Sequence, residues 1–163
     1  LQGEFRFIFI LHPIEHRPRI DGKRDWGQYL QEQCQQRGIT FLAPDEAFEP
    51  SLVACDVMLT DHTSLALYGA MLRKPLVFVP VPEDAIEKDG LIWQLKEMSL
   101  VIKQDASDLR DCLLNAMNSP PSDALEDLCK EINSYPGEAR DRLRKEIYGL
   151  LGISAKQGHT KTP

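Results

Sequence analysis

Residues 56–79 carry the pattern that most restricts the fold of this chain: a short apolar run, a polar turn, a helical stretch and a second apolar run. The first run, 56–60, has the length of a buried strand, and the periodicity of residues 62–72 indicates a helix. Two short strands joined by one helix must run parallel, because the chain crosses a face of the sheet between them. The stretch therefore predicts a β-α-β unit.

The same alternation continues along most of the chain. We expect strands over residues 6–11, 39–42, 56–60, 75–80 and 100–103. Helices are expected over about 25–37, 46–54, 62–72, 91–98, 105–117, 122–134 and 138–151, with N-caps at Asp25, Asp45 and either Asp105 or Ser107. This order predicts an α/β fold with a doubly wound parallel sheet of about five strands and a C-terminal helical segment. We expect one domain over residues 1–153 and a disordered tail over 154–163.

Composition excludes several classes of function. The net charge of −6 and the pI of about 5.2 argue against a nucleic-acid-binding surface, which is normally basic. The four cysteines show no C-x-x-C spacing, which argues against a zinc ribbon and favours a reducing compartment. The chain contains no D-x-D motif and no run near the ~20 apolar residues that a membrane span needs.

The polar turn is the candidate site, because ligands of open parallel sheets bind beyond the carboxyl ends of the strands. Asp61, His62, Thr63 and Ser64 lie there, at the start of a helix whose first backbone amides lack intrahelical partners. Such a terminus favours phosphate, and the hydroxyls of Thr63 and Ser64 can add donors. Asp61 would repel a phosphate, so it fits better as a helix cap or as an acceptor for a ligand hydroxyl. The alternative is purely structural, with Asp61 or Thr63 as an N-cap and His62 as a surface residue.

Four segments carry a resemblance to a known family. They are LHP (11–13), ACDVMLTDHTS (54–64), KPLVF (74–78) and YPGEARDR (135–142). In order and spacing they resemble the C-terminal nucleotide-binding domain of GT-B-type transferases, most closely the CDP-glycerol glycerophosphotransferase family of teichoic-acid polymerases. The resemblance covers roughly residues 6–150 and implies a Rossmann-like sheet. His62 stands where that family usually has Tyr, and Thr63 replaces the first Ser of its motif.

This resemblance implies a role in donor binding for a transferase that acts on cell-surface polymers. The donor would be a CDP-linked alcohol or a nucleotide sugar, bound with no metal and no cofactor. Thr63, Ser64 and the amide of Leu65 would hold its diphosphate, and Arg142 could add a cation. His12 would face the cleft as a phosphate donor or as an acid or base.

The resemblance also implies the rest of the enzyme. A facing N-terminal domain would bind the acceptor, so the chain is expected to be a fragment that is inactive alone. The expected location is cytoplasmic, with peripheral association at the inner membrane face through the missing part. Two alternatives remain open: an enzyme similar to UDP-N-acetylglucosamine 2-epimerase, and a non-catalytic α/β interaction module that uses Thr63-Ser64 only as a cap.

Overall fold

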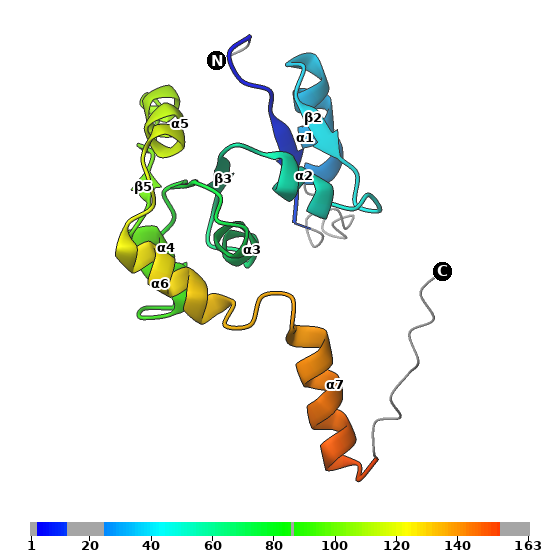
Figure 1. The fold of residues 1–163 in the computed structure, drawn as a ribbon. Helices are drawn as coiled ribbons and strands as arrows, with labels where there is room; N and C mark the ends of the chain where they lie inside the picture. The colour runs from blue at the N-terminus through cyan, green and yellow to red at the C-terminus, as the bar shows by residue number, and fades with distance from the viewer. Residues whose placement is uncertain (1–2, 13–24, 86, 154–163) are drawn as a thin grey trace, which may run out of the picture.

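The computed structural model describes residues 3–12, 25–85 and 87–153, so the tail predicted over 154–163 lies outside the described residues (Figure 1). Strands and helices alternate over most of this length. The strands are β1 (Ile8–Ile10), β2 (Thr40–Leu42), β3 (Met58–Thr60), β4 (Leu76–Phe78) and β5 (Leu100–Val101). The helices are α1 (Trp26–Gln36), α2 (Glu49–Ala54), α3 (Leu65–Met71), α4 (Leu91–Glu97), α5 (Leu109–Asn118), α6 (Asp123–Ile132) and α7 (Ala139–Leu150), with a short 3-10 helix η2 (Glu83–Ala85).

All strand pairs are parallel, which confirms the predicted α/β class. The five strands lie in two sheets rather than in one: β1 pairs with β2, and β3-β4-β5 form a second sheet in that order. The register pairs Ile8 with Thr40 in the first sheet and Met58 with Leu76 in the second. Each observed strand is two or three residues long, shorter than every predicted run.

Helices cover both faces of the three-stranded sheet. On one face, Phe78 and Leu76 pack with buried residues of α3, α4 and α6, among them Ala66, Leu95 and Leu128. On the other face, Val77 and Ile102 pack with Leu113 and Ala116 of α5. Alternate residues of β4 thus enter opposite clusters, as expected for a strand buried on both faces.

Gly69 allows α3 to approach the sheet closely. A Cβ atom at this position would lie 2.7 Å from Sδ of Met58 and 2.8 Å from Cδ2 of Leu76, both of them buried. Any side chain larger than glycine at this position would therefore need Met58 and Leu76 to move.

The helix caps show where local sequence signals succeed. Asp25 caps α1 as predicted, accepting a hydrogen bond of 3.0 Å from the amide of Gln28. Ser122 caps α6 in the same way, through the amide of Leu125 at 3.2 Å.

The other predicted caps are wrong, because those side chains bind elsewhere or the helix starts later. Helix α2 begins at Glu49, after Phe48 and not after Asp45, since Pro50 is favoured in a first helical turn. Helix α5 begins after Asp108. Asp105 instead accepts from the amide of Ser107 at 3.0 Å, inside the turn before the helix.

The C-terminal helix α7 extends away from the sheets in Figure 1. It has no buried residue, and its apolar side chains Leu143, Ile147 and Leu150 are all exposed. The predicted C-terminal helical segment is therefore present, but α7 adds nothing to either core cluster. Among the described residues, no helix is long and apolar enough to cross a membrane.

Candidate functional site

The predicted site residues 61–64 connect the carboxyl end of β3 to the first turn of α3. Thr60 ends the strand and is buried, while Ala66 in the first turn of α3 is completely buried in the core. Both ends of the connection are thus fixed by packing. Asp61, His62 and Thr63 are half-buried between them, and Ser64 is exposed.

Asp61 shapes the turn rather than the helix end. Its Oδ1 accepts a hydrogen bond of 2.9 Å from the amide of Thr63. The N-cap residue of α3 is Ser64, whose side chain makes no capping hydrogen bond. The carboxylate of Asp61 therefore lies before the helix and holds the loop in a tight turn.

Several donors at this turn have no protein acceptor among the described residues. The first hydrogen bonds of α3 run from the amide of Ala66 to the carbonyl of Thr63, at 3.1 Å, and from the amide of Leu67 to the carbonyl of Ser64, at 3.0 Å. The amides of Ser64 and Leu65 precede these bonds and donate to no described backbone carbonyl. Together with the exposed Ser64 hydroxyl they offer an acceptor-rich ligand three donors over two residues.

His62 adds an unusual feature to the same turn. Its Nδ1 atom is buried and has no hydrogen-bond partner among the described residues. Buried polar atoms in folded proteins are almost always paired, so an unpaired ring nitrogen is a point at which a ligand or water would complete the structure.

The other two predicted site residues lie on different parts of the fold. His12 is exposed and follows β1, in the two-stranded sheet. Arg142 lies on α7, where its guanidinium carbon is 3.5 Å from the ring centroid of Tyr135 and its Nη1 is 3.6 Å from Oε2 of Glu138. The structure thus assigns Arg142 to local contacts within the C-terminal segment, and the role of His12 in a shared cleft stays a prediction.

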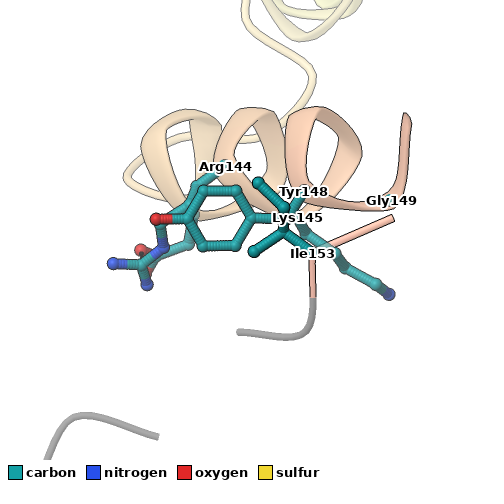
Figure 2. A pocket seen from close by; sticks show the side chains of 6 residues that line it. Arg144, Lys145, Tyr148, Gly149 and Ile153 are labelled. Atoms are coloured by element: carbon teal, nitrogen blue, oxygen red, sulfur yellow. Dashed lines mark hydrogen bonds and ion pairs between the residues drawn. The ribbon is translucent and has the colours of Figure 1, made fainter. Parts of the chain in front are cut away.

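Two hollows of the surface lie elsewhere. One, of about 360 Å³, is lined almost entirely by residues of α7. Figure 2 shows Arg144, Lys145 and Tyr148 in its wall, together with Ile153, which follows the helix. A larger groove of about 580 Å³ runs along the amino ends of β4 and β5, between the ends of α3, α4 and α5 and the start of α6. Neither hollow includes residues 61–65.

Lys74 has a structural contact that the sequence did not reveal. Its Nζ donates to the carbonyl of Val53 at 2.6 Å and to that of Cys55 at 2.8 Å. Its partners are about 20 residues away along the chain, so no local signal could have indicated them.

The described residues show neither a grouped set of metal ligands nor an activated thiol. They contain no group of three His, Cys, Asp or Glu side chains placed to hold a metal ion. Burial raises the pKa of each thiol above its usual value, so the thiolate form is disfavoured. This holds for Cys34, Cys55, Cys112 and Cys129, all of which are free thiols.

Comparisons with protein-family models, with curated proteins and with solved structures find no match to this chain. The turn between β3 and α3, and the strands around it, are the features of the chain that point to a function.

Proposed function

We propose that the chain is the donor-binding domain of a transferase that uses a nucleotide diphosphate, with the turn at residues 61–65 as its phosphate site. The observation that carries the proposal is the set of unpaired donors at the carboxyl end of β3. The amides of Ser64 and Leu65 and the Ser64 hydroxyl are open in the described structure, and the buried, unpaired Nδ1 of His62 belongs to the same turn. Groups of this kind stabilise the charge of a leaving nucleotide phosphate.

The arrangement of helices supports the proposal. Helices on both faces of the three-stranded sheet, and parallel strands throughout, are what a doubly wound nucleotide-binding fold requires. In such a fold β1 and β2 would belong to the same sheet as β3, and His12 would then follow a strand whose carboxyl end lies at the same edge as Asp61.

Roles within the proposed site follow from what each group can donate. Ser64 and the amide of Leu65 bind phosphate oxygens, and Thr63 adds its hydroxyl. Asp61 keeps the turn closed and stays out of direct phosphate contact, because two anions would repel. His62 donates from Nδ1 to a phosphate or to a bound water. No metal is needed for binding of this kind.

The larger enzyme remains part of the proposal. The donor is a CDP-linked alcohol or a nucleotide sugar, a facing N-terminal domain supplies the acceptor, and nucleic acid is not a partner. We place the enzyme in the cytoplasm, with peripheral association at the inner membrane face through that other domain. Residues of α7 have no role in the phosphate site, except for the cation that Arg142 could supply after leaving Tyr135.

Calorimetric titration of the chain with CDP, UDP and GDP tests the proposal. We expect saturable binding of one of the three. Ser64→Ala removes a hydrogen bond to a charged group, worth about 1.5–3 kcal/mol, so affinity should fall roughly tenfold or more. Ser107→Ala, at an exposed position outside the turn, is the matched control and should leave affinity unchanged. If none of the three diphosphates binds, or if both variants bind equally well, the turn is only a helix start.

A second candidate function is a non-catalytic interaction module. The exposed apolar residues of α7, with Leu143 at 62% and Leu150 at 88% of full exposure, favour it. Absence of nucleotide binding in the titration would favour this function over donor binding.

A further inference from the structure

Helix α7 carries an apolar stripe that is open in the described structure. Leu143, Ile147 and Leu150 follow one another at spacings of four and three residues, so they lie on one side of the helix. Their exposures are 62%, 42% and 88%. The small hollow along α7, which Tyr148 and Ile153 help to line, includes none of the three (Figure 2). The stripe therefore remains available for packing against another surface.

The larger groove, of about 580 Å³, is a second apolar surface that the described chain leaves open. It lies at the amino ends of β4 and β5, beside the first two turns of α6. Leu125 and Cys129 of α6, one turn apart, line it from that side. Met98 and Leu100 line it as well and are 39% and 40% exposed. Its volume and its apolar lining are typical of a binding site.

Helices α6 and α7 carry opposite net charges. Four acidic residues and one lysine give α6 a net charge of −3, whereas four basic and two acidic residues give α7 a net charge of +2. Glu97 and Glu126 line the groove, and the ion pair of Glu126 with Arg73 is a long one, at 3.8 Å. Arg140 and Arg144 flank the apolar stripe of α7. Packing of α7 along the groove would therefore bring opposite charges together at the edge of an apolar contact.

The described contacts direct α7 away from the groove of its own chain. Near the start of the helix, the Arg142 guanidinium lies 3.5 Å from the ring centroid of Tyr135 and 3.6 Å from the carboxylate of Glu138. The amide of Glu138 donates to the carbonyl of Tyr135 at 3.1 Å. Beyond these contacts α7 continues past the end of α6, whereas the groove lies beside the start of α6 (Figure 1). The stripe can therefore reach the groove of a second molecule with no change in the chain.

We propose that two copies of the chain form a dimer in which α7 of each copy packs into the groove of the other. A two-fold axis near residues 133–138 sets each α7 antiparallel to the partner's α6, so the same contact is made twice. Cys129 lies about one turn before the end of α6, and Leu143 lies about one turn after the start of α7. The two residues are therefore level in the dimer. Leu125 and Ile147, one turn further from the axis, are level in the same way.

Analytical ultracentrifugation of the 163-residue chain, over a roughly hundredfold range of concentration, measures the dimer. We expect a reversible equilibrium between monomer and dimer that weakens at high salt. Leu143→Asp should weaken dimerisation roughly tenfold or more, because each of the two contacts loses a buried leucine. Val53→Asp changes an equally exposed apolar residue of α2, at 63%, and should leave the dimer intact.

Thermal unfolding at low concentration shows that both variants are folded, because α7 adds nothing to either core cluster of the monomer. At high concentration the unfolding temperature of the full chain should rise, since the dimer stabilises the folded state by mass action. A chain that ends at Gly137 lacks α7, and its unfolding temperature should not depend on concentration.

A disulfide trap identifies which groove the helix enters. One chain carries Leu143→Cys together with Cys129→Ser, and a tagged second chain keeps Cys129, so the two thiols can meet only between copies. Mild oxidation of the mixture should link the two chains, and mass spectrometry of the linked peptides identifies the pair. Lys145→Cys in place of Leu143→Cys puts the thiol on the opposite side of α7 and should not link the chains.

Four results would overturn the proposal. The first three are a monomer at every concentration, equal dimerisation of Leu143→Asp and Val53→Asp, and equal linking by the two cysteine variants. The fourth is an internal disulfide, formed at low concentration, in a chain that carries Leu143→Cys and keeps Cys129. That bond would show that α7 fills the groove of its own chain.

Discussion

Two glycines in helices allow a residue-scale test of packing. Alanine has the higher helix propensity by about 1 kcal/mol, so Gly→Ala in a helix stabilises where space allows. At Gly149 of α7 an added Cβ meets nothing within 4 Å, whereas at Gly69 it meets buried Met58 and Leu76 at under 3 Å. Overpacking a core costs about 1–3 kcal/mol. We expect Gly69→Ala to lower the free energy of unfolding by about 1 kcal/mol in urea denaturation, and Gly149→Ala not to lower it.

Lys74 supports a prediction about the end of α2. Its two hydrogen bonds satisfy carbonyls that the helix end leaves open. Lys74→Met keeps the length of the side chain and removes both bonds, which should cost about 1–3 kcal/mol. Lys103→Met, at an exposed lysine, is the control. Equal unfolding midpoints for the two variants would show that the Lys74 contacts contribute nothing.

The ion pair of Glu4 with Arg110 predicts a pH dependence. Two hydrogen bonds, of 2.6 and 2.8 Å, join the carboxylate to the guanidinium, and they lower the pKa of Glu4 below its usual 4.5. A lowered pKa means that the pair stabilises the fold above pH 4.5 and that this stabilisation is lost as the pH falls through the folded-state value. The melting temperature of Glu4→Gln should therefore lie slightly below that of the parent at pH 7 and match it in acid.

The controls for that measurement follow from the exposure of the pair. Both side chains are largely exposed, so the effect should be small and should shrink at high salt. In a double-mutant cycle with Arg110→Met the two substitutions should be non-additive at pH 7. Additive effects there would show that the pair has no coupling.

At the scale of elements, α6 and α7 are predicted to differ in what they contribute. Leu128 of α6 is buried in the core, with Leu125 and Ile132 packed beside it, whereas α7 has no buried residue. A chain that ends at Gly137 should therefore unfold at the same temperature as the full chain. A chain that ends at Pro121 should lose about 3 kcal/mol or more, since burying one leucine is worth about 1.5–3 kcal/mol. If removal of α7 lowers the unfolding temperature as much as removal of both helices, α7 packs on the body in solution.

Elements were predictable where their signals are local. The periodicity of residues 26–36 and the Asp25 cap define α1, and the Ser122 cap defines α6. The start of α5 was missed because Asp105, Ser107 and Asp108 are equally good capping residues by type. In the structure Ala106 has a left-handed φ of 55°, and the helix begins only after Asp108.

At the scale of the whole molecule, the sequence predicted the number of strands and their parallel direction but not their division into two sheets. Apolar runs and crossing helices determine direction, because each connection is short. Which edges pair depends on contacts between residues far apart in the chain, such as Ile8 with Thr40 or Leu59 with Val77. The position of the proposed phosphate site, after the strand that precedes Asp61, was a sequence prediction, whereas the open amides at Ser64 and Leu65 and the unpaired Nδ1 of His62 required the structure.

The open edges of β1 and β3 have a practical consequence for anyone who handles the isolated chain. Natural proteins protect such edges with charge, proline or a covering loop, because unpaired strands recruit others of their kind. Here the edge residues Ile8 and Leu59 are apolar and exposed, at 46% and 39% of full exposure. Concentrated solutions of the chain alone should therefore aggregate on storage, which light scattering would detect.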